Sequence, residues 1–171
     1  MRGADFSISQ RLDMADGVLD LNYVASYVDE KVFAVGGTSA SINCVGQFNL
    51  PIGGDACSRP VTKLKHRATA SWTRGCLTAQ LTWRHLSKAS DGRTDQDFFV
   101  EEIDAFNYFE LSGNYAFSNG LTATIGVRNL FDEAPPVLDM WNSWEANTFP
   151  NMYDVFGRSI FARLKYTFDS I

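Results

Sequence analysis

The stretch that decides the fold is YDVFGRSIFARLKYTF, residues 153–168. In its second half, apolar side chains occupy every other position, namely Ile160, Ala162, Leu164, Tyr166 and Phe168. The intervening positions include the cations Arg163 and Lys165. Successive side chains of a β-strand point to opposite faces, so this alternation predicts a strand with one apolar and one polar face.

Six further segments show the same two-residue period and are joined in pairs by turn signals. Residues 15–17 read Ala-Asp-Gly, Gly75 separates the second pair, and Asn119-Gly120 separates the third. Gly and Asn-Gly supply the positive φ that tight hairpin turns demand. The predicted strands are residues 5–14, 18–29, 61–74, 76–86, 103–117 and 121–131, followed by the segment that ends at Phe168. We therefore predict an all-β fold, an antiparallel up-and-down meander of about seven long strands.

The connections between these strands alternate between short and long. Short turns lie near residues 15, 75 and 119. The long connections lack a two-residue period and cover residues 30–60, 87–102 and 132–156. Transmembrane β-barrels sort their connections in this way, because tight turns face the periplasm and long loops face outside. The alternation therefore favours the wall of a transmembrane barrel.

The two predicted faces differ in chemistry as the two faces of a barrel wall do. Aromatic residues on the apolar face fall near the strand ends, at Trp72, Tyr115 and Phe117 towards the short turns and at Tyr27, Trp83 and Phe131 towards the long loops. Two such belts suit the two membrane interfaces. The other face is rich in Thr and in cations, and in a barrel it would line a wet lumen. The residues predicted to face the lumen are Arg67, Arg84, Arg128, Arg163 and Lys165.

Two of the three cysteines could form a disulfide in an oxidising compartment. Cys44 and Cys57 both lie in the first long loop, where a disulfide between them would restrict an aperiodic segment. Two cysteines without a nearby pair of histidines do not make a zinc site, so metal binding is the weaker reading. We therefore predict a Cys44–Cys57 disulfide. Cys76 has no obvious partner and is expected to be a small buried or interfacial residue.

Composition narrows the class of protein. The 171 residues are 45% hydrophobic, which excludes a disordered tail, and the net charge of −5 argues against a nucleic-acid partner. No apolar run approaches the ~18 residues of a spanning helix, so any membrane role must use strands. The first ten residues, MRGADFSISQ, lack the apolar core of a secretion signal. An exported protein would therefore have an amino-terminal part that this chain lacks.

The sequence resembles the carboxyl end of the β-barrel of TonB-dependent outer-membrane receptors. The penultimate strand of that family typically reads GVRNLFD with Pro soon after, and residues 126–136 read GVRNLFDEAPP. The likeness covers most of residues 5–168 and is strongest from residue 103 onward, through NYFELSGNYAF and the closing strand. It is looser in CVG, KLKHRATASW and LTWRHL. The resemblance implies that residues 1–171 are a single partial domain, the last seven strands of a 22-stranded barrel without its plug and earlier strands.

The resemblance also implies a function for the parent protein. Such receptors sit in the outer membrane of Gram-negative bacteria and import a scarce ligand such as a ferric siderophore, cobalamin or glycan. The implied partners are outer-membrane lipid, the rest of the barrel and plug, and the TonB complex through the missing amino-terminal part. Barrel-assembly machinery would read Tyr166 and Phe168 as the terminal signal. The extension Asp169-Ser170-Ile171 departs from the family pattern and puts efficient reading of that signal in question.

Two other classes of protein share the alternation. One is a small diffusion porin or adhesin barrel, and the other is a soluble β-sandwich that acts as a binding module. An enzyme is not expected, because the sequence contains no GxSxG, HExxH, Walker or GxGxxG motif. The two histidines, His66 and His85, both fall on the predicted apolar faces, away from a wet lumen. The sequence suggests no cofactor.

Overall fold

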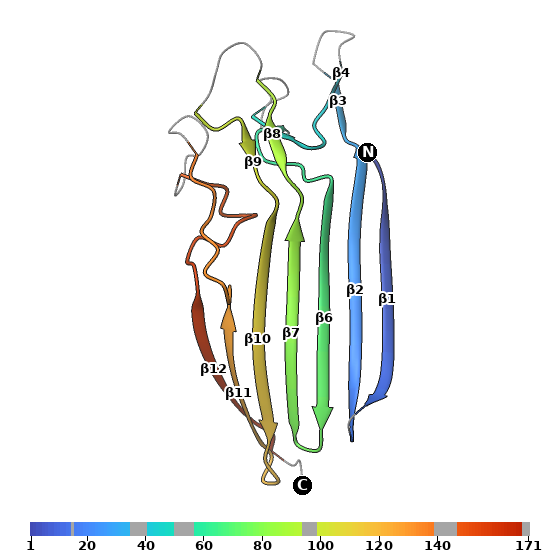
Figure 1. The fold of residues 1–171 in the computed structure, drawn as a ribbon, viewed down its shortest axis with the longest axis vertical. Coiled ribbons are helices and arrows are strands. Elements are labelled where there is room, and N and C mark those ends of the chain that lie inside the picture. Colours follow the sequence, from blue (N-terminus) through green and yellow to red (C-terminus); the bar gives the residue numbers. More distant parts are fainter. Residues whose placement is uncertain (15, 35–40, 50–56, 94–98, 139–146, 169–171) are drawn as a thin grey trace.

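The seven long strands form one antiparallel sheet in sequential order (Figure 1). The computed structural model describes residues 1–14, 16–34, 41–49, 57–93, 99–138 and 147–168. The long strands are β1 (Arg2–Met14), β2 (Gly17–Glu30), β6 (Leu64–Arg74), β7 (Leu77–Leu86), β10 (Phe106–Ala116), β11 (Leu121–Arg128) and β12 (Ser159–Tyr166). The predicted all-β meander is therefore confirmed. The sheet stays open, since β1 and β12 lie at opposite edges of it.

In the described parts of the first two long connections, which the sequence predicted to lack a two-residue period, five short strands are present. β3 (Val32–Ala34) pairs with β4 (Ser41–Asn43). β8 (Ala89–Asp91) lies between β5 (Gln47–Phe48) and β9 (Glu102–Ile103) in a three-stranded sheet. Strands of two or three residues are too short to show a period, which is why the sequence pattern missed them. They lie at the end of the molecule that carries the long connections (Figure 1).

The tight turns lie at the opposite end and use the expected residues. Asp16, Gly75 and Gly120 have φ angles of 56°, 55° and 80°. The Asn119 side chain adds a hydrogen bond by accepting from the Leu121 amide at 3.2 Å. Short and long connections are therefore sorted between the two ends of the sheet, as the sequence predicted.

The last two long strands are shorter than predicted, at eight residues each. β11 stops at Arg128 because Asn129 adopts a left-handed φ of 49° and bonds to the backbone of Glu133 through both side-chain atoms, at 2.8 and 2.9 Å. β12 stops at Tyr166, two residues before Phe168. The Thr167 amide still donates to the Gly120 carbonyl at 3.0 Å. Residues 169–171 lie outside the described part of the chain.

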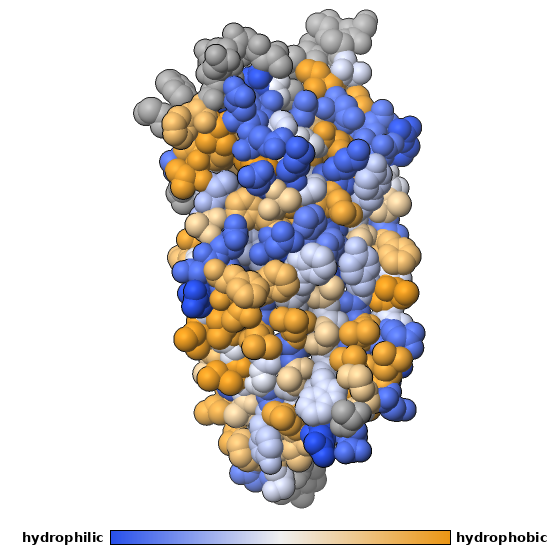
Figure 2. Space-filling view, in the orientation of Figure 1, coloured by the Kyte–Doolittle hydropathy of each residue, from blue (hydrophilic) through white to orange (hydrophobic). Residues whose placement is uncertain are grey.

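One side of the seven-stranded sheet, the apolar face, carries apolar side chains in continuous rows. The pairing register places Ile8, Tyr23, Ala68, Trp83 and Phe109 side by side across five strands. Large side chains on this face stay open to solvent, with Phe6 56%, Ile160 74% and Leu164 75% exposed. In the view of Figure 2, hydrophobic side chains gather most over the lower part of the strand region, with hydrophilic ones interspersed. A continuous apolar surface of this extent marks a site of contact with lipid or protein.

The other side, the polar face, carries the charged and hydroxyl side chains. Arg67 lies opposite Arg84, and Arg163 and Lys165 lie opposite Thr124 and Thr122. Arg128 lies opposite Ser159, in the same alternating series. The two-residue period of the strands therefore places most apolar side chains on one face and most charged ones on the other.

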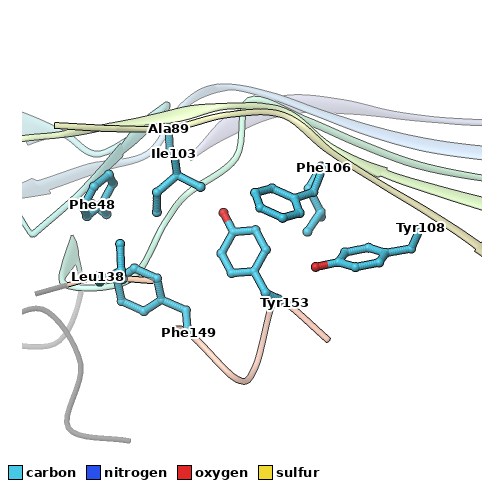
Figure 3. Close-up of a cluster of buried hydrophobic side chains, with 9 residues drawn as sticks. Phe48, Ala89, Ile103, Phe106, Tyr108, Leu138, Phe149 and Tyr153 are labelled. Carbon is cyan, nitrogen blue, oxygen red and sulfur yellow. The ribbon is translucent and has the colours of Figure 1, made fainter. Parts of the chain in front are cut away.

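The main apolar cluster lies at the end with the long connections and is called the loop-end core. Phe149 and Tyr153, from the connection between β11 and β12, point towards the sheet and meet Ile103 and Phe106 (Figure 3). The ring centroids of Phe106 and Tyr153 are 4.8 Å apart. The other buried members are Phe48, Leu86, Ala89, Tyr108 and Leu138. The long connections therefore fold together.

Two of the three cysteines are buried in a disulfide, and the third is a free, exposed thiol. A disulfide joins Cys44 to Cys57, with both side chains fully buried and the Cα atoms 5.6 Å apart. That separation lies within the range of protein disulfides. Cys76 was expected to be buried or interfacial. The buried alternative is wrong, because the residue is exposed at the tight turn after Gly75, and the interfacial alternative stays a prediction.

Candidate functional site: a charged pocket on the polar face

A polar pocket of about 410 Å³ opens on the polar face where β6, β7, β10 and the end of β11 meet the last long connection. Its charged lining comprises Arg67, Arg84, Arg128, Glu110 and Asp154. Two rows of the sheet build it. Arg67, Arg84 and Tyr108 share one row, and Thr82 and Glu110 share the next. Alternation along the strands brings both rows to the same face, so sheet register creates the pocket.

The Arg84 guanidinium is held from two sides. It forms an ion pair with the Asp154 carboxylate, and it lies over the Tyr108 ring at 4.6 Å. The Asp154 amide also donates to the Tyr108 hydroxyl oxygen at 3.2 Å. Asp154 therefore ties the connection between β11 and β12 to the sheet.

Arg128 is held by a second carboxylate. Its Nε lies 3.7 Å from a Glu110 carboxylate oxygen, and its guanidinium lies 4.9 Å from the Phe161 ring centroid. Arg67 differs, because it has no ion pair or hydrogen bond within the part of the chain that the structure describes. Three guanidinium groups face two carboxylates, which leaves the pocket with an excess of positive charge at Arg67.

The structure brings together only some of the residues that the sequence singled out. Arg67, Arg84 and Arg128 line the pocket. Arg163 and Lys165 lie on the polar face of β12 and are exposed outside it. Tyr166 and Phe168 lie near the short turns, with ring centroids 4.7 Å apart.

Sequence reasoning missed Asp154 and Tyr108 as parts of the site. Asp154 falls in an aperiodic connection, where no spacing rule indicates which strand it will meet. Tyr108 reads as one more aromatic residue of a strand, yet it is 3% exposed and contacts both Arg84 and Asp154. The available signal was the pair Tyr153-Asp154, one apolar and one charged, beside the start of the last strand.

Charged groups also stabilise the long connections above the pocket. Asp91 pairs with Arg93 at 2.6 Å, and the two side chains are 3% and 17% exposed. Burial raises the pKa of Asp91, but hydrogen bonds from Arg93 and Asn49 outweigh that effect and hold the pKa below its ordinary value. The hydrogen bond from Lys88 at 2.9 Å likewise lowers the pKa of Glu102. These carboxylates are therefore charged at neutral pH.

The two histidines lie on the apolar face, away from the pocket. Their rings stack with centroids 4.9 Å apart, and His85 Nδ1 lies 2.9 Å from the Asn107 side-chain oxygen. Within the described ranges, no three or more His, Cys, Asp or Glu residues are grouped to hold a metal ion. Across the same ranges, no helix is long and apolar enough to cross a membrane.

Comparisons with known proteins place the fold. No family model matches the sequence, and no curated protein matches it. A solved structure of a ferric enterobactin receptor variant from Pseudomonas aeruginosa is similar, with a TM-score of 0.50 and 14% sequence identity. The match covers 97% of this chain and 31% of the receptor chain. At that identity the likeness shows the fold alone, an all-β meander like that of about a third of the receptor.

Proposed function

We propose that this chain is the carboxyl-terminal wall segment of a TonB-dependent outer-membrane receptor, which takes up a scarce ligand such as a ferric siderophore, cobalamin or glycan. The observation that carries the proposal is the apolar face. Rows of apolar side chains cross its strands, with side chains such as Leu164 and Ile160 about three-quarters exposed. Such a surface is costly in water and stable against lipid.

The ends of the apolar face support the same proposal. Trp72 and Tyr115 lie near the short turns, and Tyr27 and Trp83 lie nearer the long connections. Aromatic side chains favour the two interfaces of a membrane. On this account, lipid covers the sheet between the two aromatic belts, the short turns face the periplasm, and the long connections face outside.

The polar face would line the lumen, so Arg67, Arg84, Arg128, Arg163 and Lys165 would face water and the plug. β1 and β12 each have one edge without a partner in the described sheet. Open edges of this length pair readily with other strands, so the rest of the barrel is the expected partner of both. Tyr166 and Phe168 would serve barrel-assembly machinery, and the TonB complex would act through the amino-terminal part. The proposal assigns no catalytic step to the chain.

The alternatives differ in what covers the apolar face. A soluble β-sandwich needs a second protein layer there, but the described loops pack at the end of the sheet and on the polar face, around Tyr108 and Arg84. That packing disfavours the sandwich. A small diffusion porin or adhesin barrel shares the lipid-facing surface and differs in needing no energised uptake. Uptake of ferric enterobactin as a first probe, with and without the TonB complex, separates the receptor from the porin.

Cysteine labelling in intact Gram-negative cells tests the proposed topology. Cys76 is exposed at a short turn, and a membrane-impermeant maleimide should label it only after the outer membrane is opened. Glu101 is exposed in a long connection. A Glu101→Cys change in a Cys76→Ala background should be labelled in intact cells. Labelling of Cys76 in intact cells, or protection of the cysteine at position 101, would contradict the assignment of the two ends.

A further inference from the structure

The ion pair at the centre of the charged pocket joins a residue of the sheet to a residue of a loop. Arg84 belongs to a paired strand of the sheet, whereas Asp154 belongs to the last long connection. Both side chains are about a third exposed, at 33% and 37%. Ion pairs with this much access to water are weak and readily exchanged. The Asp154 carboxylate therefore holds Arg84 reversibly.

Arg67 places a second positive charge beside Arg84. It lies directly opposite Arg84 in the antiparallel pair of β6 and β7. Like charges at directly opposite positions repel each other, and one carboxylate neutralises only one of the two. A ligand with two or more carboxylate groups would neutralise both, which Asp154 does not do. The arrangement therefore favours an external polycarboxylate over the internal carboxylate at sufficient concentration.

The space beside the two arginines suits a small ligand. The pocket volume of about 410 Å³ lies in the range of small-molecule sites, which run from about 300 to 1,000 Å³. The other facing charges are Arg128 and Glu110, which neutralise each other at 3.7 Å. Net positive charge is left at Arg67 and, once Asp154 departs, at Arg84.

The neighbours of Asp154 limit what moves when it departs. Tyr153 is 2% exposed and fixed in the loop-end core against Phe106 (Figure 3). On the other side, Gly157 has a φ of 63°, and the Arg158 amide donates to Asp132 Oδ1 at 2.7 Å. The Asp154 amide is held as well, since it donates to the Tyr108 hydroxyl oxygen at 3.2 Å. Release of the Asp154 carboxylate therefore needs only rotation of its side chain, which would uncover Arg84 without unfolding the connection.

We propose that Arg67 and Arg84 form a binding site for a polycarboxylate, and that the Asp154 carboxylate is the internal competitor that this ligand displaces. The inference rests on the proposed function only in taking the polar face as the ligand-accessible side. It requires neither transport nor a particular compartment.

Calorimetric titration of citrate into the full chain in dodecyl maltoside micelles tests the proposal. An Arg67→Gln change should weaken citrate binding about tenfold, because charged hydrogen bonds are lost. An Asp154→Asn change should strengthen citrate binding by up to about fivefold, because the competitor is removed while its shape is kept. Arg163→Gln is the matched control: it removes one exposed cation from the same face outside the pocket and should leave affinity unchanged. Inorganic phosphate should bind more weakly than citrate.

Three results would overturn the proposal. Weaker binding by the Asp154→Asn variant would make Asp154 a ligand contact instead of a competitor. Equal losses in the Arg67→Gln and Arg163→Gln variants would indicate general attraction to a cationic face. No citrate binding by either wild-type or Asp154→Asn protein would remove the site altogether. If Arg67→Gln fails to fold by circular dichroism, the Asp154→Asn comparison decides alone. A labelling pattern opposite to the one expected for Cys76 and position 101 would overturn the topology. It would not change the expected order of citrate affinities among the variants.

Discussion

Asp132 and Arg158 close the last long connection by meeting at its base. The Asp132 side chain accepts a hydrogen bond from the Arg158 amide at 2.7 Å, and its second oxygen lies 3.8 Å from the Arg158 guanidinium. Asp132 follows the turn after β11, and Arg158 directly precedes β12, so this contact joins the two ends of the connection. The pocket residue Asp154 lies within the segment that they close.

Removing the Asp132 side chain should destabilise the closure of the connection between β11 and β12. We expect Asp132→Ala to lower the free energy of unfolding by about 1 kcal/mol, since the amide of Arg158 loses its acceptor. Asp132→Asn retains an acceptor oxygen and loses only an exposed ion pair, so its effect should be smaller. Urea titration of the two variants measures both values. Equal effects would assign the stabilisation to charge and not to the hydrogen bond.

The Cys44–Cys57 disulfide should be present in the exported protein and should stabilise the first long connection. Closing a loop between residues 13 apart contributes about 3 kcal/mol in the chain-entropy account. The Cys44→Ala and Cys57→Ala double variant should therefore show faster proteolysis near these residues. A non-reducing peptide map should recover Cys44 linked to Cys57 and Cys76 free. Recovery of both loop thiols in free form would refute the pairing.

Acid should weaken the long connections before it affects the sheet. Asp91 has a pKa below its unfolded value, so its stabilisation is complete above about pH 4 and is lost as pH falls through the folded pKa. An Asp91→Asn variant should be less stable near neutral pH, with a smaller further loss in acid. Near-ultraviolet circular dichroism in urea, followed from about pH 6 to pH 2, measures this difference. An identical acid dependence in both proteins would assign the loss to other groups.

The Tyr153 hydroxyl should contribute little, while its ring should contribute much. The hydroxyl is buried without a hydrogen-bond partner among the described residues, and burial raises its pKa to about 12. Tyr153→Phe should therefore be neutral or slightly stabilising. Tyr153→Ala should cost about 3 to 5 kcal/mol in the loop-end core, as large aromatic truncations do. Protease sensitivity of the last connection reports both, and a large loss in Tyr153→Phe would reveal a partner for the hydroxyl.

The periodic part of the sequence predicted the sheet and its faces. Alternation placed Leu164 and Arg163 on opposite sides of β12, and Asp-Gly and Asn-Gly signals placed the turns at Asp16 and Gly120. The faces of a strand and the position of a turn depend only on local backbone geometry, so a short stretch of sequence is enough to predict them. The turn at Asn129 shortened β11. The alternation already fails there, since Asn129 falls in the apolar series and Leu130 in the polar one, and the predicted strand ran past that break.

The pocket depended on information that the sequence pattern does not hold. Arg67 and Arg84 could be placed on one face, but their direct pairing follows from the register of β6 and β7. Asp154 reaches Arg84 across 70 residues of chain, through a connection with no period. Contacts of this kind arise from tertiary packing of the loop-end core, so they could not be read from spacing.

Two neighbouring residues of β12 show whether the apolar face meets lipid. Leu164 lies on the apolar face, 75% exposed, and Arg163 lies on the polar face. In the full-length protein, Leu164→Arg should place a charge against lipid between the midplane and the interface, at a cost of about 1 to 2 kcal/mol, whereas Arg163→Ala should leave assembly intact. The measurement is the heat-modifiable, folded fraction of each variant recovered from outer membranes. We expect a marked loss for Leu164→Arg alone. Equal folding of both variants, or a greater loss for Arg163→Ala, would mean that the apolar face does not meet lipid.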